Sequence, residues 1–137
     1  MNHDLPIIQF GLKAETMDSC ARGILNGNKR ATTGLHAAYL FDNEPFPRAG
    51  DQTMVRDSRD RDIAIIEVTK VETRLYREVD EDFAAIEGAG DKSLAYWQKV
   101  HWDYLGQECL RVGTPLDKNI KVVLEYFKVV KIFTNID

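Results

Sequence analysis

Apolar residues recur at three- and four-residue spacing along the first part of the chain, which predicts an amphipathic helix. We expect Thr16 to cap the start of this helix and Gly27 to end it in a left-handed conformation. A short apolar stretch before it, from Ile7 to Leu12, is typical of a strand. The apolar stripe of the helix consists of Met17, Cys20, Ala21, Ile24 and Leu25.

Strand-like segments dominate the middle and the end of the chain. Gln52 to Arg56 and the long run from Ile63 to Tyr76, rich in Ile, Val and Thr, flank a polar turn and predict a hairpin. Lys121 to Phe133 carries apolar residues on both faces, as a buried strand does. We expect Thr32 to Leu40 to be extended and to lead into a proline-containing loop at 42–47.

Two further helices are predicted between these strands. The first runs from Val79 to Ile86 with Asp80 as its cap, and the second runs from Ser93 to about Arg111. Strands outnumber helices and do not alternate with them regularly, which predicts an α+β fold with helices packed around a small β-barrel or a strongly bent sheet. The length of 137 residues, without a repeat or linker, predicts a single domain over 1–137.

Composition narrows the range of functions. The net charge of −4 argues against a protein that coats nucleic acid, so any such contact should be local. The two cysteines, Cys20 and Cys109, fall on apolar helix faces and are expected to be buried thiols. Free thiols, no signal-peptide pattern after Met1 and no apolar run near the roughly 20 residues of a membrane span predict a cytoplasmic protein without a membrane partner.

The turn at residues 27–33 holds the first candidate functional residues. Lys29 stands three residues before Thr32. A lysine made less basic by burial or by a cationic neighbour can act as a base or nucleophile, and a threonine hydroxyl needs such a base to attack a carbonyl. The structural alternative is a lysine that complements the helix dipole and a threonine that starts a strand. From the residues alone, this alternative is the stronger.

Other candidates lie further along the chain. Glu87 precedes a glycine-containing loop, where a carboxylate could shuttle a proton, although a surface glutamate is the simpler interpretation. Arg48 and Arg56 are candidate contacts for a substrate phosphate or base carbonyl. Trp97 and His101 share one face of the long helix and could stack on a nucleobase, but such stripes are more often core. The histidines are too far apart for a metal site, and no cofactor is predicted.

Taken in order, four segments resemble the ASCH family over about residues 10 to 130. They are Gly27-x-Lys29-x-Ala31-Thr32, Pro45-x-Pro47-x-x-Gly50-Asp51, the run from Ile65 to Val71, and Ala85-x-Glu87-Gly88-x-Gly90-Asp91-x-Ser93-Leu94-x-x-Trp97-x-x-x-His101. The resemblance implies a PUA-like β-barrel with flanking helices, a fold related to RNA-binding domains. Where the family often has lysine after Pro47, this chain has Arg48, which keeps the positive charge.

The resemblance also implies a function. One bacterial branch of the family hydrolyses the acetyl amide on the exocyclic amine of cytidine with a lysine, a threonine three residues later and a distant glutamate, which match Lys29, Thr32 and Glu87. That branch is shorter and lacks much of the helix that carries Trp97 and His101 here. Other members are linked to ribonuclease activity or RNA binding. The expected partner is therefore a nucleoside or single-stranded RNA and not DNA; the oligomeric state stays open.

Overall fold

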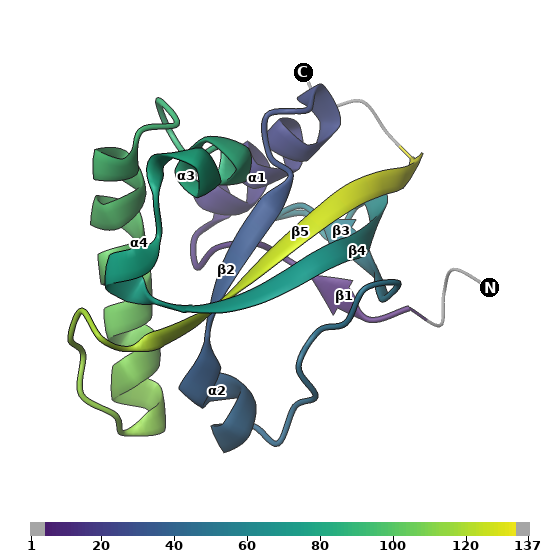
Figure 1. Ribbon diagram of the computed structural model, residues 1–137. Helices are drawn as coiled ribbons and strands as arrows, with labels where there is room; N and C mark the ends of the chain where they lie inside the picture. The colour runs from purple at the N-terminus through teal and green to yellow at the C-terminus, as the bar shows by residue number, and fades with distance from the viewer. Residues whose placement is uncertain (1–4, 134–137) are drawn as a thin grey trace.

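The computed structural model describes residues 5–133, so the Met1 segment considered for a signal peptide lies outside it. Within these residues, five strands form one sheet, and four α-helices and a short 3₁₀ helix surround it (Figure 1). The elements in chain order are β1 (Ile7–Ile8), α1 (Ala14–Asn26), β2 (Ala31–Leu35), α2 (His36–Phe41), β3 (Gln52–Arg56), β4 (Asp62–Leu75), η2 (Tyr76–Glu78), α3 (Glu81–Glu87), α4 (Leu94–Val112) and β5 (Lys121–Ile132).

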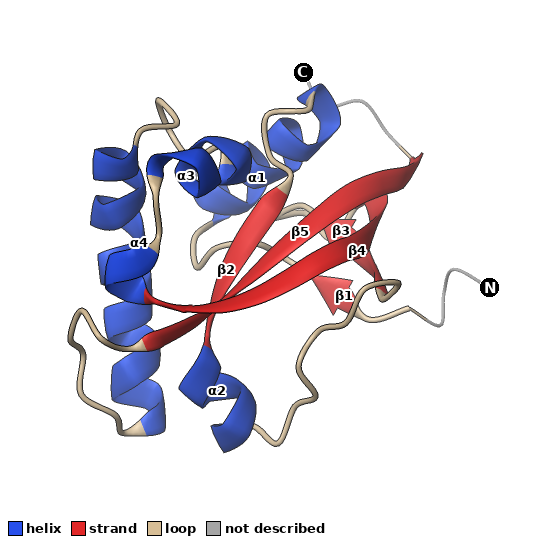
Figure 2. Ribbon diagram, in the orientation of Figure 1, coloured by secondary structure: helices blue, strands red, loops and turns tan. Residues whose placement is uncertain are grey.

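The strand order in the sheet is β1-β3-β4-β5-β2, so β1 and β2 form its two edges. The β1–β3 pair is parallel, and the other three pairs are antiparallel. The two long strands, β4 and β5, cross the molecule as a twisted ribbon, and register shifts interrupt their pairing near Ile65 and Val68 (Figure 2). The predicted α+β fold is confirmed; within residues 5–133 the sheet is strongly bent but does not close into a barrel.

Two apolar clusters cover opposite faces of this sheet. One joins β2 and β5 to α2, α3 and α4 and includes Leu124, Phe83, Trp97 and Leu105. The other packs α1 against β3, β4 and Phe127 of β5. Leu124 and Phe127 are an odd number of positions apart on one strand, which puts their side chains on opposite faces. The sheet is therefore the common wall of both clusters.

Most element boundaries follow local sequence signals. Asp80 caps α3 as predicted, and Ser93, the predicted first residue of the long helix, caps α4; each side chain accepts a backbone N–H in the first turn. Gly27 ends α1 with φ 90°, also as predicted, but α1 is preceded by Lys13 and not by Thr16. β1 is shorter than expected, with two residues. No helix within residues 5–133 combines the length and apolarity that a membrane span requires.

The prediction for 32–40 was wrong in its second half. β2 ends at Leu35, and the chain turns directly into α2. Leu35 and Ala38, three positions apart, are both buried in the cluster beside α4. A helical turn allows both side chains to reach that cluster, whereas in an extended chain they would point to opposite faces.

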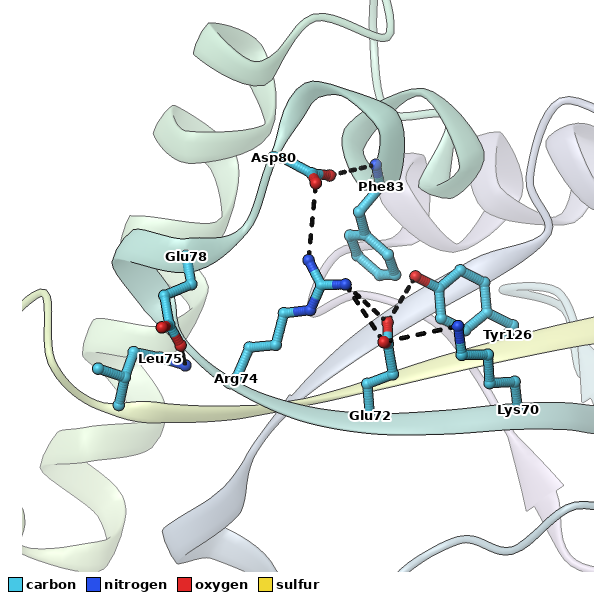
Figure 3. A network of polar contacts seen from close by, with 8 residues as sticks. All are labelled: Lys70, Glu72, Arg74, Leu75, Glu78, Asp80, Phe83 and Tyr126. Atoms are coloured by element: carbon cyan, nitrogen blue, oxygen red, sulfur yellow. Dashed lines mark hydrogen bonds and ion pairs between the residues drawn. The ribbon is translucent and has the colours of Figure 1, made fainter.

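A polar network fixes the start of α3 beside β4 and β5 (Figure 3). Glu72 on β4 accepts hydrogen bonds from the Tyr126 hydroxyl at 2.8 Å and from Arg74 at 3.1 Å. The Arg74 guanidinium also lies 3.6 Å from the carboxylate of Asp80, the residue that caps α3. The N-terminus of α3 is thereby tied to the centre of the sheet, so the position of its last residue, Glu87, is also constrained.

The end of α3 is fastened to the α1–β2 turn. The Arg30 N–H donates to the Ile86 carbonyl at 2.9 Å, and Lys92 Nζ donates to Asn28 Oδ1 at 2.9 Å. Gly88 ends α3 with φ 81°, and the Asn28 carbonyl oxygen occupies the space that a Cβ would need there. The glycine after Glu87 therefore permits close backbone packing between two segments distant in sequence.

A pair of glycine substitutions tests this close approach. Gly88 and Gly113 both end helices with similar positive φ, 81° and 75°, but no atom lies within 4 Å of a Cβ at Gly113. Gly113→Ala should cost about 1–2 kcal/mol of unfolding free energy through its φ alone. Gly88→Ala should cost about 1–3 kcal/mol more because of the added clash. Equal losses in urea unfolding would contradict the packing described.

Candidate functional site

The carboxylate of Glu87 is the centre of a buried polar cluster, and only 5% of the residue is exposed. Its Oε1 accepts hydrogen bonds from Thr33 Oγ1 at 2.7 Å and Trp97 Nε1 at 2.8 Å. Its Oε2 lies 2.9 Å from His101 Nε2 and 3.5 Å from Lys29 Nζ. The structure thus brings together four of the predicted residues and adds Thr33. These five residues are called the Glu87 cluster below.

The long helix α4 supplies two members of the cluster through its periodicity. Trp97 and His101 are one helical turn apart, and their rings stack with centroids 4.3 Å apart. His101 Nδ1 lies 2.9 Å from the Trp97 carbonyl oxygen, while Nε2 faces Glu87. Because both partners are acceptors, both bonds form together only when each ring nitrogen carries a proton.

The ammonium of Lys29 lies at the open edge of β2. The Arg30 carbonyl accepts from Phe127 N–H of β5, so the next carbonyl along the chain, that of Ala31, points away from β5. Lys29 Nζ donates to this Ala31 carbonyl at 2.8 Å and lies 5.0 Å from the centre of the Phe10 ring. The lysine is thus held by a carbonyl, a carboxylate and an aromatic face.

The environment of Glu87 keeps its carboxylate ionised. Burial alone would raise its pKa, but the charges of Lys29 and His101 and the hydrogen bonds from His101 and Thr33 lower the pKa from 4.5 to about 2. Orientation of Lys29 by the ionised carboxylate fits this environment. Donation of a proton to a leaving group at neutral pH does not fit it.

Thr32 and Thr33 lie on opposite faces of β2 because side chains alternate along a strand. Thr33 is buried against Glu87, whereas Thr32 is half-buried and faces the other side, where its antiparallel partner is Glu125 of β5. The Lys29–Thr32–Glu87 set of the sequence analysis is therefore divided between the two faces, with Lys29 at the edge between them. The alternation of side chains along a strand predicts that the two threonines face opposite sides of the sheet. It does not predict which of them faces Glu87.

The face that carries Thr32 holds a second ionisable group, which we had not identified from the sequence. Glu125 is the single acidic residue in the apolar run 122–127. An isolated acidic residue in such a run was the sequence feature that could have identified it as a candidate. Burial, and after it the charges of Asp51 and Glu44, raise its pKa from 4.5 to about 7, while the charge of Lys29 opposes the change. Tyr39 of α2 contributes to the same face, since its hydroxyl lies 3.1 Å from the Cβ position of Gly34.

The two arginines proposed as substrate contacts lie outside the Glu87 cluster. Arg56 pairs with Asp62 across the β3–β4 hairpin at 2.8 Å. Arg48 is exposed in the loop before β3, and its backbone N–H donates to Asp51. Within residues 5–133, neither guanidinium contacts a member of the cluster. Their expected role in substrate binding stays a prediction.

Trp97 and His101, the other predicted contacts, are 1% and 7% exposed and already bonded within the cluster. Both are therefore placed to support Glu87 and do not offer a free face for stacking a base. Cys109 is buried and Cys20 half-buried, and neither is in a disulfide. Among residues 5–133, no group of three or more His, Cys, Asp or Glu side chains is arranged to hold a metal ion.

Comparison with known proteins agrees with this architecture. A family model for the ASCH domain matches residues 6–131. The chain belongs to the ASCH domain family. Members of this family are thought to bind RNA or to act as hydrolases. No protein of curated function matches the chain.

Three solved structures resemble this ASCH domain. An ASCH domain from Lactobacillus crispatus JV V101 is 38% identical with a TM-score of 0.89, covering 93% of this chain and 80% of that one. A protein from Enterococcus faecalis V583 is 27% identical with a TM-score of 0.85, covering 93% and 77%. A mutant ASCH protein from Zymomonas mobilis, 10% identical with a TM-score of 0.56 over 93% and 71%, shares the fold alone.

The acid sensitivity of the protein tests the charge state of Glu87. A depressed pKa stabilises the folded state above about pH 4.5, and this stability is lost as the pH falls toward 2. Glu87→Gln should lose on the order of 3 kcal/mol at pH 7, and the difference from the wild type should close between pH 4.5 and 2.

An exposed carboxylate on the same helix provides the control. Glu81→Gln should follow the wild-type profile of unfolding free energy against pH, measured by urea denaturation. If the unfolding free energy of Glu87→Gln also stays parallel to that of the wild type down to pH 2, the buried carboxylate is not ionised as described.

Proposed function

We propose that the protein is a hydrolase that removes the acetyl group from the exocyclic amine of acetylated cytidine. The observation that carries this proposal is the position of the Lys29 ammonium. It is fixed by Glu87 and the Ala31 carbonyl at the edge of β2, next to the face that presents Thr32. A fixed positive charge beside an accessible hydroxyl is an arrangement suited to acyl transfer.

The roles of the residues follow from this geometry. Thr32 attacks the acetyl carbonyl or positions the water that does so. Lys29 stabilises the oxyanion that forms; we had expected it to act as a base as well, but its ion pair with Glu87 favours the electrostatic role. Glu87 orients Lys29, and Thr33, Trp97 and His101 hold Glu87. Preorganised donors of this kind typically contribute about 100- to 1,000-fold in rate.

Cleavage of single-stranded RNA is the second candidate. The Lys29 ammonium is a fixed positive charge at the edge of β2, held there by Glu87 and the Ala31 carbonyl. Such a charge suits stabilisation of a phosphate during cyclisation. A binding module without catalysis is the third candidate, and its RNA affinity should fall steeply with salt concentration.

The two adjacent threonines offer a matched test of the hydrolase proposal. Thr32→Val removes the hydroxyl from the reactive face and should abolish turnover of acetylcytidine without unfolding the protein. Thr33→Val removes a buried hydrogen bond to a charged group and should cost about 1.5–3 kcal/mol of stability. Turnover by its folded fraction should fall much less than in Thr32→Val. Liquid chromatography of the nucleoside and thermal unfolding give the two readouts.

The outcome also discriminates between the candidates. Unchanged turnover in Thr32→Val, or loss of turnover in Thr33→Val alone, would contradict the proposed roles. A wild-type protein that leaves acetylcytidine intact but forms 2′,3′-cyclic phosphate ends on short RNA would favour the ribonuclease.

A further inference from the structure

Glu125 lies beside Thr32 on the same face of the sheet. The two residues are directly paired across the antiparallel β2 and β5 strands, an arrangement that places their Cβ atoms about 4.5–5.5 Å apart. On the other side, Glu125 pairs with Val71 of β4, which carries no charge. The Glu125 carboxyl is therefore within reach of any group that the Thr32 hydroxyl touches.

The carboxyl of Glu125 differs from that of Glu87 in its polar contacts. Within residues 5–133 it has no hydrogen-bond or ion-pair partner, although the residue is only half-exposed. No side-chain polar atom in this part of the chain is both fully buried and unpaired. The oxygens of Glu125 therefore remain accessible, and a bound molecule could reach them.

The charges around Glu125 come from several elements. Lys29 precedes β2, Tyr39 belongs to α2, Glu44 lies in the loop after α2, and Asp51 lies just before β3. The two acidic neighbours disfavour its charged form and Lys29 favours it, with burial as the largest influence, so its pKa is about 7. A carboxyl with this pKa exchanges protons readily at neutral pH, whereas Glu87 stays ionised.

We propose that Glu125 is the residue that transfers the proton during amide hydrolysis, an inference that rests on the proposed function. As a carboxylate, it accepts a proton from the water that Thr32 orients while the new bond forms between water oxygen and acetyl carbon. It then gives this proton to the exocyclic nitrogen as the carbon–nitrogen bond breaks. The products are acetic acid and the free amine, and Glu125 returns to its carboxylate form.

This assignment completes the set of roles on the site. Lys29 stabilises charge on the carbonyl oxygen, Thr32 positions the attacking oxygen, and Glu125 moves the proton. Glu87 is buried on the other face and acts through Lys29. Thus the positioning carboxylate and the proton-transferring carboxylate are different residues.

Kinetics of acetylcytidine hydrolysis against pH test the proposal. Wild-type kcat/KM should rise with pH around the Glu125 value of about 7, because the attack requires the carboxylate. Glu125→Gln keeps the size of the side chain but cannot carry the proton. It should lower kcat by about 100- to 10,000-fold and remove this rise. Circular dichroism and thermal unfolding would show whether the variant is folded.

Glu44→Gln is the second variant, since Glu44 is exposed and influences Glu125 only through its charge. Removal of that charge should shift the rising limb of the profile to lower pH while turnover persists. Unlike a merely structural effect, this shift requires that Glu125 controls the rate.

The outcomes separate this inference from the proposed function. An active wild type, with Glu125→Gln folded and equally active or with the Glu44→Gln profile unshifted, would overturn the role of Glu125 alone. A wild type with no activity on acetylcytidine would overturn the proposed function and, with it, this inference.

Discussion

A single buried carboxylate, that of Glu87, holds three parts of this protein in place. It accepts hydrogen bonds from β2 and α4 and forms an ion pair with the turn between α1 and β2. An unpaired charge with this degree of burial would be strongly unfavourable, so the surrounding donors are required by its presence. Both oxygens of the Glu87 carboxylate have two polar partners each. Each element that supplies a donor is therefore fixed relative to the others.

The Glu87 cluster holds the Lys29 ammonium in a defined position on a small, bent sheet. The network around Arg74 fixes the start of α3 and the Glu87 cluster fixes its end. The Lys29 ammonium is fixed as well, because the Ala31 carbonyl and the Glu87 carboxylate both hold it at the edge of β2. The opposite face carries Thr32 and Glu125. In the proposed function, one face of β2 supplies the support and the other supplies the chemistry.

Much of this fold follows from local sequence signals. The helix caps at Asp80 and Ser93 and the β3–β4 hairpin were predictable because each depends on residues close in sequence. The helix at 36–41 was not, since burial against the distant α4 decides it. Glu87 and Lys29 were identified through the family pattern. Thr33 and Glu125 were missed because strand register, which only the folded sheet defines, determines what each side chain faces.

An NMR titration with cytidine, the product of the proposed reaction, tests the division between the two faces most directly. We expect chemical-shift changes at the backbone amides of Thr32, Gly34 and Glu125. The indole N–H of Trp97 should stay nearly unchanged, because that group is hydrogen-bonded to Glu87 on the other face of the strand. A large shift of the Trp97 indole, with no change at Thr32 or Glu125, would contradict this division between the two faces.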